Sequence, residues 1–370
     1  MQHNYKLFIE KRMVHVFKKM GSLMVFFLPV VLIIGFIFTS FATKKETETT
    51  WKKFESPEEA GWSSSKLREA RQYYNSLNST AAIGIYKGKV LFEWGDVSQN
   101  TNAHSVRKSF LSALYGIHEE EGTVNLDKSL DELNIDDDAQ LSDVERQATI
   151  EDLLTSRSGV FLPAGEESRD MINRRPPRES HKSGTYFYYN NWDFNTLGTI
   201  FNRQTDSDLF EEFKEKIAIP LGMEDFNLNN TMYRMEAGRS SHPSYLFSMS
   251  ARDMARFGQL YLQNGKWEGE QIIPENWIER STLPHAETNN TVYDYGYLWW
   301  VASDNPLGDS GLFSAVGRHG QSIDVIREKD FVFVHRVDSS KTSVRFLYQG
   351  VNQRQRLRLL ELILEAKITD

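Results

Sequence analysis

Cysteine is absent from all 370 residues of this protein. Without a thiol, the chain forms no disulfide, uses no cysteine nucleophile, binds no zinc through thiolates and carries no lipid on a cysteine. Exported proteins also fold without disulfides, so the absence of cysteine leaves the cellular compartment open.

Positive charge is also scarce, because 43 lysines and arginines face 51 aspartates and glutamates, which gives a net charge of −8. Phosphate backbones bind to basic surfaces, so we expect no nucleic-acid partner. We find no His/Asp/Glu spacing typical of a metal site and expect a protein that works without metal or cofactor. The acidic stretch 127–138 fits no calcium loop, and we interpret it as a solvated loop.

One long hydrophobic run stands out, residues 23–42, with about 20 uncharged residues that suffice to cross a bilayer. Four basic residues lie just before it in 11–19, so residues 1–22 are expected in the cytoplasm and the rest outside. This predicts a bacterial inner-membrane anchor with the folded part in the periplasm or at the cell surface. The alternative is a signal peptide cleaved after Ser40-Phe41-Ala42, followed by secretion. We favour the anchor, because the run is longer than the apolar core of a usual signal peptide.

Residues 43–55 are a polar linker by composition, and residues 56–370 are long enough for one large domain. Periodicity and turn residues predict its elements. Helices are expected at 63–77, 105–118, 209–217, 251–263 and 353–367, and strands at 81–86, 90–94, 322–326, 331–337 and 343–348. With strands at both ends and helices between them, the pattern predicts an α+β fold: an antiparallel sheet flanked by the last helix, with an inserted helical domain.

Two Ser-x-x-Lys sequences occur, at Ser63–Lys66 and Ser105–Lys108. A spacing of three places serine and lysine on one helical face, where a neutral lysine can take the proton of the hydroxyl. The first sequence opens a polar helix and is interpreted as a cap with a solvated lysine. The second leads into an apolar helix, so Lys108 extends toward the core, although a plain N-cap is the alternative for Ser105.

Two further patterns follow the second serine along the chain. The segment 186–198 (YFYYNNWDFNTLG) contains Tyr-x-Asn in two overlapping registers, at 188–190 and at 189–191, and a third match lies in the predicted helix at 73–75. Core packing is the alternative role for its aromatic residues. A basic-x-Gly triplet, Arg318-His319-Gly320, leads into a predicted strand. The triplet at 182–184 comes too early, and the one at 341–343 lacks the glycine.

The order of these three patterns resembles the β-lactamase and penicillin-binding-protein superfamily. The sequence is similar to its class C β-lactamase-related branch of esterases, peptidases and 6-aminohexanoate-dimer hydrolases. The resemblance runs from about 56 to 367 and includes PEEAGWSSSKL, TIEDLLTSRSGV, PLGMEDF, SMSARDMARFGQLYL, YGYLWW and FVFVHRVD. It implies a β-lactamase/transpeptidase-like fold, with Ser105 as nucleophile and Lys108 as the group that takes its proton.

The family register, counted to the pair Leu197-Gly198, implies Tyr189 as the acid/base tyrosine and Asn191 as the contact to a substrate amide. The same resemblance implies an oxyanion hole made by the N–H groups of Ser105 and Gln321, the residue after Gly320. Arginine at 318 departs from the lysine or histidine of many relatives. It cannot donate its proton, so Arg318 is expected to anchor substrate, and whether His319 carries a proton stays open.

We therefore expect an exported serine hydrolase that forms an acyl-enzyme with a small-molecule or peptide substrate. An ester, an amide, a D-amino-acid peptide and a β-lactam all remain open as substrates. The alternative is a penicillin-binding-type sensor or binding protein that uses the same cleft without turnover. The oligomeric state is not indicated by the sequence.

Overall fold

The computed structural model describes residues 51–303, 307, 309–340 and 350–368. The predicted anchor at 23–42 and the predicted strand at 343–348 lie outside these residues. Within the described part of the chain, no helix combines the length and the apolar character needed to cross a bilayer.

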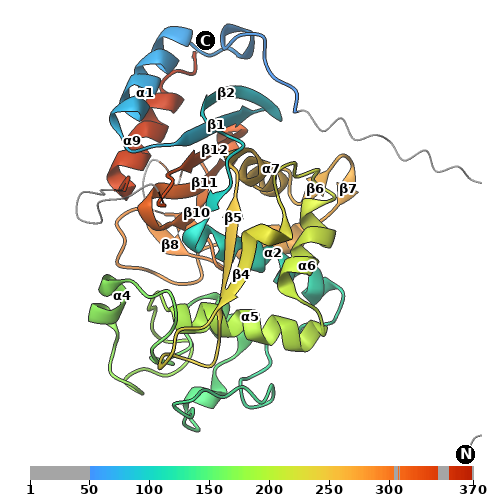
Figure 1. Cartoon of the computed structure of the whole chain (residues 1–370), viewed down its shortest axis with the longest axis vertical. Helices are drawn as coiled ribbons and strands as arrows, with labels where there is room; N and C mark the ends of the chain where they lie inside the picture. The colour runs from blue at the N-terminus through green and yellow to red at the C-terminus, as the bar shows by residue number, and fades with distance from the viewer. Residues whose placement is uncertain (1–50, 304–306, 308, 341–349, 369–370) are drawn as a thin grey trace, which may run out of the picture. The chain divides into compact units, whose positions relative to one another are not determined.

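A seven-stranded antiparallel sheet joins the two ends of the domain, in the order β2-β1-β12-β11-β10-β9-β8 (Figure 1). Its strands are β1 (Ala81–Tyr86), β2 (Lys89–Gly95), β8 (Tyr293–Tyr295), β9 (Trp300–Ala302), β10 (Leu312–Gly317), β11 (Gln321–Ile326) and β12 (Phe331–Arg336). The first strand pairs with the last, from Ala81↔Arg336 to Tyr86↔Phe331. The predicted sheet made of N- and C-terminal segments is confirmed.

Helices cover both faces of this sheet, which explains why every residue of β11 and β12 is buried. The helices α1 (Ser64–Ser76) and α9 (Gln353–Leu364) pack against each other at one end of Figure 1. The helix α7 (Ala251–Leu262) packs against β1, β11 and β12. The side chain of Ser63 accepts a hydrogen bond from the Lys66 N–H, so the first Ser-x-x-Lys sequence is a helix cap, as predicted.

The predicted insertion lies between β3 (Thr101–Asn102) and β8 and is mainly helical. Its helices are α2 (Arg107–Glu120), α3 (Ile150–Leu154), α4 (Arg169–Arg174), α5 (Asn191–Thr205), α6 (Leu209–Phe213), α7 and α8 (Glu275–Ser281). Short strands accompany them. A three-stranded sheet has the order β3-β5-β4, with β4 at Thr231–Arg234 and β5 at Ser244–Met249, and a hairpin is formed by β6 (Lys266–Trp267) and β7 (Glu270–Gln271). The helix predicted at 209–217 changes to a π-helix at Lys214–Ala218.

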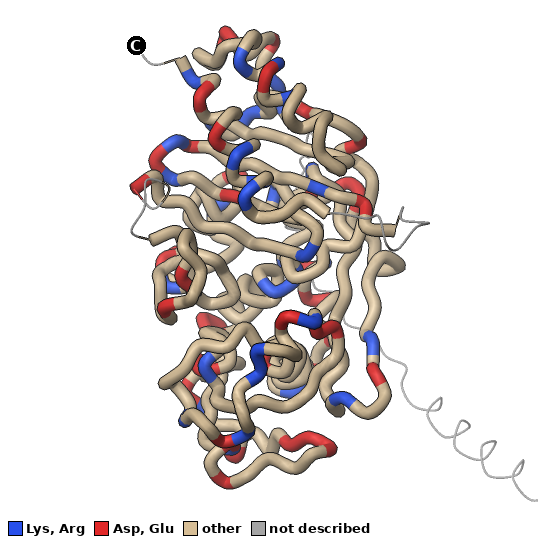
Figure 2. Tube along the Cα trace, turned by 90° about the vertical axis from the view of Figure 1, so that its left-hand side faces the viewer, with Lys and Arg blue, Asp and Glu red and all other residues tan. Residues whose placement is uncertain are grey.

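A buried ion pair connects α9 to the sheet. Asp324 on β11 pairs with Arg356 on α9, and both side chains are almost fully buried. The carboxylate of Asp324 also accepts hydrogen bonds from Ser314 (2.6 Å) and Ser322 (2.8 Å), while Arg356 donates to the hydroxyl of Tyr293 (3.0 Å). These bonds satisfy two charges that would otherwise destabilise the core. Along the chain trace, basic and acidic residues are interspersed (Figure 2).

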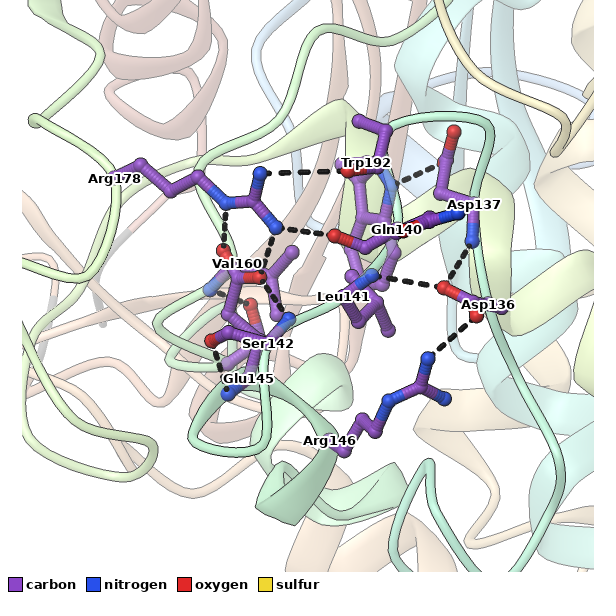
Figure 3. Close-up of polar contacts among 12 residues, drawn as sticks. Asp136, Asp137, Gln140, Leu141, Ser142, Glu145, Arg146, Val160, Arg178 and Trp192 are labelled. Atoms are coloured by element: carbon purple, nitrogen blue, oxygen red, sulfur yellow. Dashed lines mark hydrogen bonds and ion pairs between the residues drawn. The ribbon is translucent and has the colours of Figure 1, made fainter.

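The acidic stretch 127–138 differs from its prediction at one position. Asp137 is buried and accepts a hydrogen bond of 2.7 Å from the indole N–H of Trp192 (Figure 3). Its neighbour Asp136 faces outward and pairs with Arg146. The interpretation as a wholly solvated loop was wrong at Asp137, because the indole of a distant helix supplies the donor that a buried carboxylate requires.

Candidate active site

Ser105 lies in a tight turn at the start of α2. Residues His104–Val106 form one turn of 3-10 helix, and the α-helix begins at Arg107, two residues later than the predicted start. His104 has a φ of 49°, and its N–H donates to the side chain of Asn102 at 2.7 Å. This turn leaves Ser105 half-buried at the N-terminal end of the helix, where backbone N–H groups and the positive end of the helix dipole favour developing negative charge.

Lys108 is 1% exposed and contacts the three other residues predicted with it. Its Nζ lies 3.2 Å from Oγ of Ser105, 2.7 Å from Oη of Tyr189 and 3.0 Å from Oδ1 of Asn191. The aromatic rings of Tyr189 and Phe194 lie about 4 Å from the same nitrogen, at 4.1 and 4.0 Å to their centroids. The structure thus brings together Ser105, Lys108, Tyr189 and Asn191 from the start of α2 and the start of α5.

Burial sets the protonation state of Lys108. Removal from water holds the pKa of its amine well below the usual value, and the positive charges of Arg107 and Arg318 lower it further. Glu166 acts in the opposite direction, but its effect is the smallest of the four. Burial and the two guanidinium groups therefore all favour the uncharged form of Lys108.

The pKa of Tyr189 is shifted in the opposite direction. Burial raises the pKa of its hydroxyl to about 12, against smaller lowering effects from the hydrogen bond with Ser105 and from Arg107 and Arg318. Near neutral pH it is a phenol and not a phenolate. The amine of Lys108 donates to the hydroxyls of Ser105 and Tyr189 and to Oδ1 of Asn191.

The two overlapping Tyr-x-Asn registers are separated by the structure. The hydroxyl of Tyr188 donates to the carbonyl of Met171 at 2.6 Å, and Asn190 caps α5 by accepting from the Trp192 N–H. The register of Tyr189 and Asn191 is the one that reaches Lys108. The Asn191 amide also donates to the carbonyl of Gly165 at 3.1 Å, so both ends of this amide are engaged in orienting the lysine, and its predicted contact to substrate stays a prediction.

A cleft of about 450 Å³ opens at Ser105. One wall is aromatic, a second is polar, and a third comes from α4 and the loop before it. The lining includes Tyr186, Phe187, Tyr189 and Trp300 on the aromatic side, Thr288, Asn289 and Asn290 on the polar side, Glu166, Ser168, Asp170, Met171 and Arg174 near α4, and Val316, Gly317 and Arg318 at the end of β10. Such a mixed cavity suits a small organic or peptide substrate.

The third predicted motif reaches the cleft only through its first residue. Arg318 lines the cleft, and its Nη2 donates to the carbonyl of Glu166 at 2.8 Å. His319, Gly320 and Gln321 are not among the lining residues. His319 and Gly320 both have positive φ, 69° and 97°, so the chain makes a tight turn between β10 and β11. Gln321 is fully buried, and its amide bonds the backbone of Val337.

The edge of β10 lies where the motif was expected. Pairing of β10 with β9 extends from Phe313 to Ser314, and the following residues Val316 and Gly317 border the cleft. A Cβ added at Gly317 would lie 2.6 Å from the carbonyl oxygen of Ala103, so only glycine lets this strand approach the Ser105 turn. Sequence reasoning missed this segment, and the glycine directly before Arg318 was the available signal.

Comparisons with known proteins agree with this geometry. The family model described as Beta-lactamase matches residues 69–353. Among solved structures, a Bacillus anthracis protein assigned as a 6-aminohexanoate-dimer hydrolase is 21% identical with a TM-score of 0.61, covering 80% of each chain. A Pyrococcus abyssi penicillin-binding protein homologue, described as octameric, is 20% identical with a TM-score of 0.60, covering 82% of this chain and 78% of that one. A family VIII carboxylesterase is 13% identical with a TM-score of 0.59, covering 82% of this chain and 97% of that one. At these identities the solved structures establish the fold.

Proposed function

Because this chain belongs to the β-lactamase family and is a serine hydrolase, we propose that it cleaves its substrate through an acyl-enzyme on Ser105. The observation that carries the proposal is the buried amine of Lys108, 3.2 Å from the serine hydroxyl, in surroundings that lower its pKa. A base in that state is what a serine hydroxyl requires in order to attack a carbonyl.

In the first half-reaction the lone pair of Lys108 takes the Ser105 proton while Oγ forms a bond to the substrate carbonyl carbon. The protonated amine then passes a proton to Tyr189, whose own hydroxyl proton goes to the leaving oxygen or nitrogen as its bond breaks. In the second half-reaction water attacks the ester, its proton moves to Tyr189 or Lys108, and Ser105 leaves as the hydroxyl. The 2.7 Å contact between Lys108 and Tyr189 supports this path.

The oxyanion of the tetrahedral intermediate needs two donors. The N–H of Ser105 is one. For the second we propose the backbone N–H of Arg318, in place of the Gln321 N–H expected from the sequence, because Gly317 and Arg318 border the cleft while Gln321 does not. Each such donor typically contributes about 3–4 kcal/mol to transition-state binding.

The proposed substrate is an ester, an amide or a D-amino-acid peptide, with β-lactams included among the amides. A substrate carboxylate would lie beside Arg318, whose guanidinium offers further donors beyond the one bound to Glu166. We also propose that residues 23–42 anchor the protein in the membrane with the catalytic domain outside the cytoplasm.

A substrate panel tests the proposal. The full-length protein in detergent is mixed with chromogenic esters, D-Ala-D-Ala peptides and a chromogenic cephalosporin, and product is followed from milliseconds to minutes. We expect a burst that titrates the active sites, followed by steady turnover on at least one class, and neither phase in Ser105→Ala. A burst without turnover on every class would instead identify a sensor, and no burst at all would refute the mechanism.

A further inference from the structure

A second cation is buried within the Ser-x-x-Lys sequence itself. Arg107 is 3% exposed, and its Nη1 donates to the carbonyl of His104 at 3.1 Å. Its Nε and Nη2 are buried without a hydrogen-bond partner among the described residues. Its guanidinium lies over the ring of Tyr245, 5.2 Å from the centroid. A guanidinium keeps its charge in proteins, so this position holds a positive charge inside the fold.

The environment of Arg107 stabilises that charge weakly. No ion pair of Arg107 is found in the part of the chain that the structure describes, and a ring face supplies only a modest attraction. An unpaired buried charge costs free energy, which a neutral residue at this solvent-inaccessible position would avoid. Its neighbour in sequence is Lys108, which needs an uncharged amine to act as a base.

We propose that Arg107 is a positioning residue that acts through Lys108, because its fixed positive charge opposes protonation of the adjacent amine and its hydrogen bond to His104 holds the turn that carries Ser105. This inference rests on the proposed function and explains how the base is kept ready in this particular chain.

The groups that face Lys108 from the other elements support the assignment. Asn191 and Phe194 on α5 carry no ionisable group, and Tyr189 just before α5 is neutral near pH 7 because its pKa is raised to about 12. Arg318 and Glu166 carry charge at the cleft. Arg107 exceeds both in its effect on the pKa of Lys108.

Arg107 and Arg318 differ in how strongly solvent screens their charges. Arg318 is exposed, so water and salt screen its charge, whereas the buried guanidinium of Arg107 is screened much less. The unscreened charge should therefore dominate the electrostatics of the base at physiological ionic strength.

The pH dependence of kcat/KM for a neutral chromogenic ester tests the proposal in the full-length protein. Arg107→Gln keeps a hydrogen-bond donor without charge, and Arg107→Met removes both the donor and the charge while keeping an apolar side chain of similar length. Arg203→Gln is the matched control, because it removes the same charge from an exposed position about 18 Å along α5 from Asn191. Circular dichroism and thermal unfolding establish that each variant is folded.

The acidic limb of the profile reports the pKa of Lys108, because only the neutral amine accepts the serine proton. Loss of a nearby positive charge raises that pKa, so Arg107→Gln should move the limb to higher pH by about one unit, which is of the order that a unit charge several ångströms away contributes at intermediate dielectric. Rates at high pH should largely recover. Arg107→Met should move the limb in the same direction, and Arg203→Gln should keep the parental limb.

A merely structural role for Arg107 would lower the rate at every pH without moving the limb, and that result would overturn the proposal. A parental pH profile in a folded Arg107→Gln variant would also overturn the proposal. If that variant does not fold, Arg107→Met decides: a limb moved to higher pH supports the role of the charge, and a parental limb contradicts it. Failure of the proposed function looks different, because the parent itself would then show no acylation of Ser105.

Discussion

Replacing Lys108 by methionine removes the proposed base while retaining most of its volume. In the parent, Nζ contacts Ser105, Tyr189 and Asn191 within 3.2 Å, and the side chain is 1% exposed. The thioether has no lone pair basic enough to take the serine proton. General-base catalysis typically contributes 10²- to 10⁴-fold, so we expect acylation to slow by about that factor.

The effect on stability should be small, because two terms oppose each other. Oδ1 of Asn191 loses its donor from Lys108 and is left in a buried position, at a cost of about 1–3 kcal/mol. The desolvation penalty of the buried amine disappears, and a methionine sulfur beside the rings of Tyr189 and Phe194 contributes about 0.3–1.5 kcal/mol. We expect a net change within about 2 kcal/mol and a shift of a few degrees in Tm.

The assay compares the burst rate constant of an activated ester in both proteins by stopped flow, with Tm measured on the same samples. The parental rate should fall as pH drops through the lowered pKa of Lys108, since protonation removes the lone pair. In the methionine variant this limb should be absent. A folded variant with near-parental acylation would refute the reasoning and would make Tyr189 the base.

Three further outcomes are expected. Arg318→Ala should reduce kcat/KM for a carboxylate-bearing ester far more than for a neutral ester, and Arg318→Lys should restore part of the loss; equal losses with an acidic limb moved to higher pH would assign Arg318 to pKa control instead. Gly116→Ala should destabilise the protein by about 1–3 kcal/mol in urea unfolding, because the added Cβ would lie 2.2–2.5 Å from the indole of Trp277; unchanged stability would show that this contact relaxes freely. Membrane attachment should survive high salt and alkaline washing if residues 23–42 are an anchor, whereas a soluble mature protein beginning at Thr43 would show a cleaved signal.

The sequence predicted the helices and strands that are marked by their own local pattern of residues. The hairpin of β1 and β2, the cap at Ser63 and the amphipathic helix α7 each carry their own periodicity or cap residue, and the structure has them where expected. The burial of Lys108 was also predictable, because the apolar residues after it indicated a buried helix face.

The parts that sequence could not predict depend on contacts between distant segments. The sequence around Asp137 indicates an exposed carboxylate, and only the structure shows its hydrogen bond with the Trp192 indole. The choice between Tyr188 and Tyr189 depends on which hydroxyl contacts Lys108 on α2. Of the third motif only Arg318 lines the cleft, and the positive φ of His319 beside it could not be predicted from the residue pattern. The role of Arg107 appears only when its burial is known.

The most direct test of the account is to locate the acyl group. The full-length protein is treated with a slowly released, serine-directed acylating reagent, digested and mapped by mass spectrometry, alongside Ser105→Ala and Ser63→Ala. The account predicts one adduct, on the peptide containing Ser105, that is lost in Ser105→Ala and unchanged in Ser63→Ala. An adduct on any other serine, or labelling that persists in Ser105→Ala, would contradict it.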